Sequence, residues 1–248
     1  MKKIFFLLIS QIIFSQIEKN IGDFQELKAL DGINVILEKS SENNIKITGD
    51  NTENVVVINK SGTLILRMQL VKKLKGQNTV VKLKHKSRIF LIEAKQSATV
   101  ISKDTLKQST MYLKSASGGK IELNLQTEKT TADTSSGGII NIKGTSFTFE
   151  ATAKSGGVIK ANKFLSSQTE VYVSSGGACK AHARDIFEAK ASLGGAIDVY
   201  GNPKTFNQTI SLGGNITDIK NDWFSSGNFF RNHTFFYDRP CFFYYSRN

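Results

Sequence analysis

The chain has few of the residues that build metal centres and disulfide frameworks. Its 248 residues include only two cysteines and three histidines. Two cysteines cannot form a disulfide framework, and the segments around Cys179 and Cys241 differ so much in character that we expect no bridge between them. Without a cluster of Cys and His side chains, the sequence predicts no zinc site, and we expect no metal or other cofactor.

Proline is also scarce, and the apolar segments are short. Two prolines beside twenty glycines favour a strand-and-turn protein over a helical one. Lys2 and Lys3 precede an apolar run at residues 4–14, which ends in Ser15-Gln16. This run is too short to span a bilayer, which takes about 20 residues. It is typical of a secretory signal peptide at residues 1–15, with a buried first strand or helix as the alternative. We therefore expect an exported protein with no transmembrane segment in the mature chain, located in the periplasm, on the outer-membrane surface or outside the cell.

A Gly-Gly pair recurs at a nearly fixed period in the second half of the chain. Successive pairs are separated by 19, 19, 20, 18 and 19 residues. Each pair follows a serine or a leucine. Such a period is typical of a solenoid built from stacked structural repeats. The pairs are Gly118-Gly119, Gly137-Gly138, Gly156-Gly157, Gly176-Gly177, Gly194-Gly195 and Gly213-Gly214.

The residues around the glycines form columns when the repeats are aligned. The position three residues after the first glycine is almost always isoleucine, the next position is always polar, and the position seven residues before the glycine forms a looser apolar column. This alternation predicts strands with one inward face, stacked in register. The three columns are Ile121, Ile140, Ile159, Cys179, Ile197 and Ile216; Glu122, Asn141, Lys160, Lys180, Asp198 and Thr217; and Met111, Thr130, Phe149, Thr169, Phe187 and Phe206. Cys179 is therefore expected to be a buried small apolar side chain.

These patterns predict an all-β fold, a right-handed parallel β-helix that is a single-stranded solenoid with turns of about 19 residues. The repeats occupy residues 101–222. Residues 16–100 lack the Gly-Gly pairs but contain short predicted strands at residues 33–37, 45–47, 55–58, 64–68 and 80–83. This region forms either the first turns of the same helix or a separate β-layer packed on its end.

The last segment, residues 223–248, differs in composition from the rest of the chain. It holds eleven of the 24 aromatic residues. Three interpretations remain open: an aromatic tail that binds sugars or surfaces, a cap over the last turn, or an abnormal terminus such as a frame-shifted gene end. We assign no site there.

The net charge of +12 bears on partners. Residues 60–86 contain no acidic residue, and alternation at residues 80–84 predicts a strand with one lysine-bearing face. This face would attract anionic envelope glycans or lipid head groups; the alternative is a solvated face that blocks edge pairing. Nucleic-acid binding would need aromatic platforms, and only Phe90 lies near, so we expect no nucleic-acid partner. The basic cluster comprises Lys72, Lys73, Lys75, Lys82, Lys84, His85, Lys86 and Arg88.

Enzymatic sites on β-helices need clustered carboxylates or an activated nucleophile. The acidic residues of the repeat stand in columns that mostly hold other residue types, so we expect no column with carboxylates on adjacent turns. The serines before Gly-Gly, with His182 as base, lack an oriented acid partner. We assign no catalytic, cofactor-binding or metal-binding residue. The acidic residues considered are Glu122, Glu128, Asp133, Glu150, Glu170, Asp185, Glu188, Asp198 and Asp218.

The order of several short motifs resembles the family called putative auto-transporter adhesin, head GIN domain. The motifs are Leu30-Asp31-Gly32-Ile33-Asn34-Val35, Ile47-Thr48-Gly49-Asp50, Gly62-Thr63-Leu64, Tyr200-Gly201-Asn202-Pro203 and Ser211-Leu212-Gly213-Gly214. The resemblance covers residues 21–220 and implies a β-helical fold in the cell envelope of Gram-negative bacteria. It brings no catalytic residues.

The resulting hypothesis is a bacterial, exported, adhesin-like or structural envelope protein without catalytic activity. Its partner would be an envelope or surface molecule, with an anionic glycan as one candidate. The alternatives are a carbohydrate-binding module, which an exposed aromatic row would favour, and a polysaccharide-cleaving enzyme, which acidic side chains converging in a groove would favour.

Overall fold

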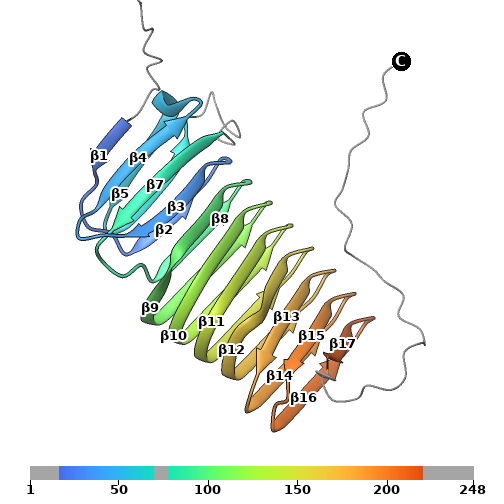
Figure 1. The fold of residues 1–248 in the computed structure, drawn as a ribbon. Helices are drawn as coiled ribbons and strands as arrows, with labels where there is room; N and C mark the ends of the chain where they lie inside the picture. Colours follow the sequence, from blue (N-terminus) through green and yellow to red (C-terminus); the bar gives the residue numbers. More distant parts are fainter. Residues whose placement is uncertain (1–16, 70–77, 220–248) are drawn as a thin grey trace, which may run out of the picture.

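The computed structural model describes residues 17–69 and 78–219, and most of them lie in strands (Figure 1). The described chain folds into a β-solenoid of about seven turns with roughly 19-residue spacing, which confirms the predicted β-helix. One short 3₁₀ helix, η1 (Thr52–Asn54), interrupts the strands of this described part. The strands are β1 (Ile17–Asn20), β2 (Glu26–Ala29), β3 (Asn34–Lys39), β4 (Asn44–Gly49), β5 (Val55–Lys60), β6 (Thr63–Met68), β7 (Thr79–His85), β8 (Leu91–Lys95), β9 (Thr99–Ala116), β10 (Lys120–Ser135), β11 (Ile139–Ala153), β12 (Val158–Val173), β13 (Ala178–Ala183), β14 (Ile186–Ala191), β15 (Ala196–Gly201), β16 (Thr205–Ile210) and β17 (Asn215–Ile219).

Each turn contributes one segment to each of two sheets. The leading sheet, which follows each corner, contains β1, β4, β7, β3, the first halves of β9–β12, and then β13, β15 and β17. The trailing sheet contains β5, β6, β2, β8, the second halves of β9–β12, and then β14 and β16. The long strands β9–β12 bend from the leading sheet into the trailing sheet, so the hydrogen-bonded ladder continues around the core.

The first turns do not stack in chain order. β2 lies between β6 and β8, and β3 lies between β7 and β9, all in parallel register. The segment 26–39 is therefore enclosed by the later strands β6 and β7 on one side and by the turn containing β8 and β9 on the other. β4 pairs antiparallel with β7, β1 with β4, and β5 with β6, so antiparallel strands end both sheets (Figure 1). The strands β2, β3, β6 and β7 thus belong to turns of the same solenoid, and antiparallel strands cover its N-terminal end.

The two glycines of each corner have different roles, as the corner Ser136-Gly137-Gly138 shows. Ser136 and Gly137 are both left-handed, with φ of 49° and 72°, so the serine shares the turn geometry with the first glycine. A Cβ on Gly137 would meet nothing within 4 Å, whereas a Cβ on Gly138 would lie 2.3 Å from the carbonyl oxygen of Ser115. The first glycine therefore supplies a positive φ, and the second permits close approach to the previous turn.

Two further corners have this geometry without a Gly-Gly pair. Asp31 and Gly32 have φ of 61° and 80°, and Gln96 and Ser97 have φ of 54° and 61°. The corners stack, because the amide of Thr99 donates to the carbonyl of Ile33 in the same way that later turns are joined. The Gly-Ile-Asn motif is therefore a corner of the solenoid.

The predicted inward columns form one continuous core. The isoleucine column is buried except at the last turn, and Cys179 within it is 1% exposed, as expected. Phe149 and Phe164 pack edge to face, with ring centroids 5.3 Å apart. Aromatic pairs of this geometry add stability beyond the area that they bury.

The last described turn exposes its side of the core. Phe206 and Ile216 are only partly buried, and Ile210 is 50% exposed. Two polar residues occupy inward columns in this turn: Gln208 stacks on the column of Ala189, and Asp218 on that of Val199. The aromatic segment at residues 223–248 and the predicted signal peptide at residues 1–15 lie outside the described residues.

Candidate functional site

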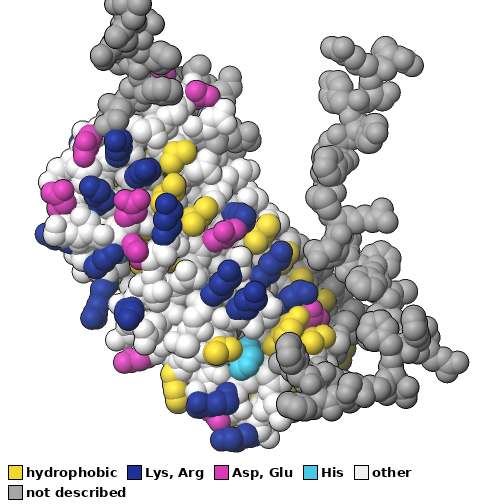
Figure 2. Space-filling model, in the orientation of Figure 1, with side chains coloured by type: hydrophobic (Ala, Val, Ile, Leu, Met, Phe, Trp, Pro, Cys, Tyr) yellow, Lys and Arg dark blue, Asp and Glu magenta, His cyan; other side chains and the backbone are white. Residues whose placement is uncertain are grey.

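The leading sheet carries charged side chains along its outer face. Basic side chains are distributed over the face in Figure 2, with acidic side chains between them. The alternation predicted at residues 80–84 is confirmed, since Lys82 and Lys84 are exposed while Val81 and Leu83 are buried. β7 is flanked by β3 and β4, so these lysines do not protect an edge strand.

One member of the predicted basic cluster does not belong to the basic surface. His85 is 3% exposed, and burial lowers its pKa, so the ring is neutral at physiological pH. Lys86 and Arg88 are exposed where the chain leaves β7. Residues 72, 73 and 75 lie outside the described part of the chain.

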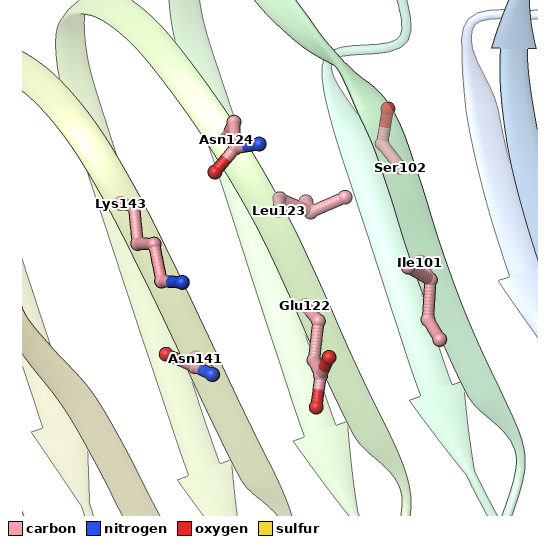
Figure 3. A pocket seen from close by; sticks show the side chains of 7 residues that line it. All are labelled: Ile101, Ser102, Glu122, Leu123, Asn124, Asn141 and Lys143. Atoms are coloured by element: carbon pink, nitrogen blue, oxygen red, sulfur yellow. The ribbon is translucent and has the colours of Figure 1, made fainter.

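A small hollow interrupts the leading sheet where its register shifts (Figure 3). It has a volume of about 140 Å³, and its lining includes Glu122, Asn124, Asn141 and Lys143. The pairing of β10 with β9 is irregular between Glu122 and Asn124, and the pairing of β11 with β12 between Asn141 and Lys143. The extra residue of β12 at this irregularity explains the 20-residue spacing in the repeat.

A second hollow of about 510 Å³ lies on the trailing sheet beside the corners. Glu93, Lys95, Lys114, Asp133 and Lys154 line it. Lys95 Nζ lies 2.5 Å from Glu93 Oε1. Burial raises the pKa of Asp133, although the positive charges of Lys114 and Lys154 oppose this shift. Charges of both signs therefore alternate in this hollow, and it does not favour a ligand of one sign.

Three glutamates form a ladder on the outer face of the trailing sheet. Glu150, Glu170 and Glu188 occupy one column on adjacent turns. The expectation that no column holds carboxylates on adjacent turns is therefore wrong. All three residues stand six positions before the first glycine of a pair, so the register that stacks the corners also stacks them. Lys129 Nζ lies 2.6 Å from Glu150, and Lys190 Nζ lies 3.3 Å from Glu170, so lysines offset much of this charge.

A salt-bridge trio joins the connection between β13 and β14 to the connection between β15 and β16. Arg184 Nη2 lies 2.8 Å from Asp185 Oδ2, and Lys204 Nζ lies 2.9 Å from Asp185 Oδ1. The hydrogen bond from Arg184, followed by that from Lys204, lowers the pKa of Asp185 to about 2.

His182 does not pair with a corner serine. Its backbone carbonyl accepts hydrogen bonds from the hydroxyls of Ser166 and Thr169, at 2.6 and 2.8 Å. Its ring Nδ1 has no partner within the described residues, and burial lowers its pKa. In that part of the chain no hydrogen bond joins the ring to a serine of a Gly-Gly corner, so no Ser-His pair forms there.

A hollow lined by basic and by no acidic side chains lies where β9 bends between the sheets. Two adjoining hollows, of about 240 and 620 Å³, share Lys39, Ser87, Arg88 and Gln108; we call them the bend groove. Lys107 lines the smaller hollow and Phe90 the larger. Sequence reasoning placed Arg88 in a basic cluster but missed Lys39 and Lys107, because three separate chain segments meet here.

Within residues 17–69 and 78–219, no three His, Cys, Asp or Glu side chains come close enough to hold a metal ion. No helix in these ranges is long and apolar enough to cross a membrane.

A two-sheet β-solenoid with open, charged outer faces is the class of protein that these features define. The chain belongs to the family described as putative auto-transporter adhesin, head GIN domain, whose model matches residues 23–203. The sequence resemblance is therefore confirmed. A comparison with curated proteins gave no match.

Solved structures from Bacteroides and Parabacteroides share this fold. A putative adhesin from Bacteroides fragilis NCTC 9343 has a TM-score of 0.75 at 19% identity, covering 84% of this chain and 98% of that one. A putative adhesin from Parabacteroides distasonis ATCC 8503 has a TM-score of 0.66 at 18% identity, covering 83% and 97%. A protein from the same strain described as a putative lipid binding protein has a TM-score of 0.66 at 19% identity, covering 83% and 96%. At these identities the likeness concerns the fold.

Proposed function

We propose that the protein is an exported envelope adhesin or interaction module that holds a partner on its outer faces without transforming it. The observation that carries this proposal is the stacking of outward residues into open columns, in which acids and bases compensate one another. The glutamate ladder shows this, since Lys129 and Lys190 engage two of its three carboxylates. An adhesive surface needs such an extended array, whereas acid–base catalysis needs a proton donor and acceptor held at one bond.

An anionic glycan is the partner that the charge favours. The chain has a net charge of +12, and Lys82 and Lys84 extend from the exposed face of β7. Basic surfaces attract anionic polymers and accelerate their encounter, an effect that salt screens. The described aromatic side chains form no continuous row, since Tyr112 is followed in its column by Thr131 and Glu150.

Two measurements test this function. Expression in a Gram-negative host, with N-terminal sequencing of the exported chain, should show cleavage after Ser15 and recovery from the envelope or medium. Beads coated with the exported chain should then retain acidic polysaccharides over neutral ones in low salt, with no change in polymer length after prolonged incubation. Shortening of the polymer would favour the polysaccharide-cleaving alternative, and retention of neither class would contradict the adhesive role.

A further inference from the structure

The bend groove combines a surplus of positive charge with one unused hydrogen-bond acceptor. Arg88 and Lys107 line it, and the side chain of neither forms an ion pair or hydrogen bond with any described residue. Lys39 is the third cation, and its Nζ donates to the carbonyl of Lys86. Two acids stand close by: Asp104 accepts from the amide of Lys39, and Asp23 pairs with Lys86. The charges of Arg88 and Lys107 therefore remain available to a ligand.

The acceptor is the imidazole of His85. Its Nδ1 lies 2.9 Å from the carbonyl oxygen of Ser87, and because a carbonyl only accepts, Nδ1 carries the proton. Burial is the main cause that lowers the pKa of this ring, so Nε2 keeps its lone pair. Nε2 is buried without a partner among the described residues, and His85 lines the smaller hollow. A buried polar atom without a partner costs free energy, which a donor from a ligand would recover.

The larger hollow adds an apolar platform. Phe90 is 37% exposed and lines it together with Arg88. Aromatic faces pack against the apolar faces of other groups and contribute large contact areas. Its volume of about 620 Å³, even without the smaller hollow, lies within the size range of roughly 300–1,000 Å³ typical of ligand sites.

We infer that the bend groove binds an acidic oligosaccharide. Arg88 and Lys107 engage its negatively charged groups, a sugar hydroxyl donates to His85 Nε2, and a sugar ring packs on Phe90. The three requirements of anion, hydroxyl donor and apolar ring face are met together in acidic sugars. Hydrogen phosphate supplies the charge and a hydroxyl donor but no apolar ring face, and a lipid membrane surface is too flat to reach a buried imidazole. This inference rests on the proposed function and names the ligand class and its site.

Binding of hexagalacturonate to the exported chain, measured by calorimetry at low salt, tests the inference. The double variant Arg88→Gln/Lys107→Gln should bind about tenfold more weakly or worse, because it removes two charge-assisted contacts. The matched control is Lys160→Gln/Lys163→Gln, which removes the same charge from exposed positions on β12. This control should bind as tightly as the native chain, and maltohexaose, a neutral hexasaccharide, should not bind.

The remaining arms separate this inference from its rivals. Hydroxyl donation to His85 should shift the ¹⁵N resonance of Nε2 on addition of hexagalacturonate, with no such shift for inorganic sulfate, an anion that has no hydroxyl at neutral pH. Binding of phosphatidylglycerol vesicles in place of the oligosaccharide would overturn the inference in favour of a lipid surface. Equal weakening in both double variants would also overturn it, because the effect would then be one of net charge; the adhesive function would survive. If beads coated with the native exported chain retained no glycan at all, the result would instead contradict the proposed adhesive function itself.

Discussion

Alanine at the second glycine of a corner should destabilise the solenoid far more than alanine at the first. The test pair is Gly138→Ala and Gly137→Ala, in an interior turn. The added Cβ of Gly138→Ala would lie 2.3 Å from the carbonyl oxygen of Ser115, 2.5 Å from its carbon and 2.8 Å from the amide nitrogen of Ala116. These are backbone atoms, so relief requires the turns to separate by about 1 Å, against a normal strand spacing of about 4.8 Å.

That separation would strain the hydrogen bond from Ile139 to Gly119, which is 2.9 Å long. We expect a loss of about 3 kcal/mol in the free energy of unfolding for Gly138→Ala, the upper part of the usual range for overpacking. Gly137→Ala has open space and costs only the left-handed backbone, about 1 kcal/mol. Urea unfolding followed by circular dichroism gives both values, provided that the slopes agree. A loss for Gly138→Ala equal to or smaller than that for Gly137→Ala would refute the close-approach argument.

Three other perturbations test burial and charge. The thiol of Cys179 is buried, and burial raises its pKa. In a Cys241→Ser background this thiol should therefore resist iodoacetamide until urea unfolds the chain, and labelling of the folded protein would contradict its inward position. The pKa of Asp185, about 2 against an ordinary 3.8, means that the salt-bridge trio stabilises the fold above about pH 4 and loses this contribution as the pH falls towards 2. Asp185→Asn should therefore melt below the native chain at neutral pH and with it near pH 2. Glu188→Gln removes a carboxylate stacked on Glu170 and should raise the free energy of unfolding by about 0.2–1 kcal/mol, whereas a lowered value would mean that the ladder is not repulsive.

The columns of the repeat could be predicted because each turn repeats the same local constraints. The burial of the isoleucine column, and of Cys179 within it, follows from the Gly-Gly spacing alone. Side chains of a strand point alternately inward and outward, and only one of the two registers buries the apolar residues. The same alignment contained the ladder of Glu150, Glu170 and Glu188, and counting back six residues from each pair would have found it. The sequence therefore already contained the register that stacks these three glutamates.

Other features depend on contacts that no local pattern encodes. The stacking of β2 and β3 between β6 and β7 on one side and β8 and β9 on the other joins segments distant in sequence. The corner at Gln96-Ser97 contains no glycine to mark it. The bend groove likewise assembles Lys39, Arg88 and Lys107 from three segments. Such sites follow from the turn order, which only the folded chain reveals.

The last described turn shows how polar residues in the inward columns oppose continuation of the solenoid. A further turn stacked on β16 and β17 would cover Phe206 and Ile216, which favours growth. It would also enclose the amide of Gln208 and the carboxylate of Asp218 in columns whose members on the three preceding turns are alanine or valine. Burial of an unpaired carboxylate costs several kcal/mol and burial of an unpaired amide about 1–3 kcal/mol. Phe206 and Ile216 are already partly buried, so each would gain less than the roughly 1.5–3 kcal/mol of full burial. The two polar positions therefore favour a covering segment that can hydrogen-bond to them over another apolar turn, and they oppose end-to-end stacking of copies through this face.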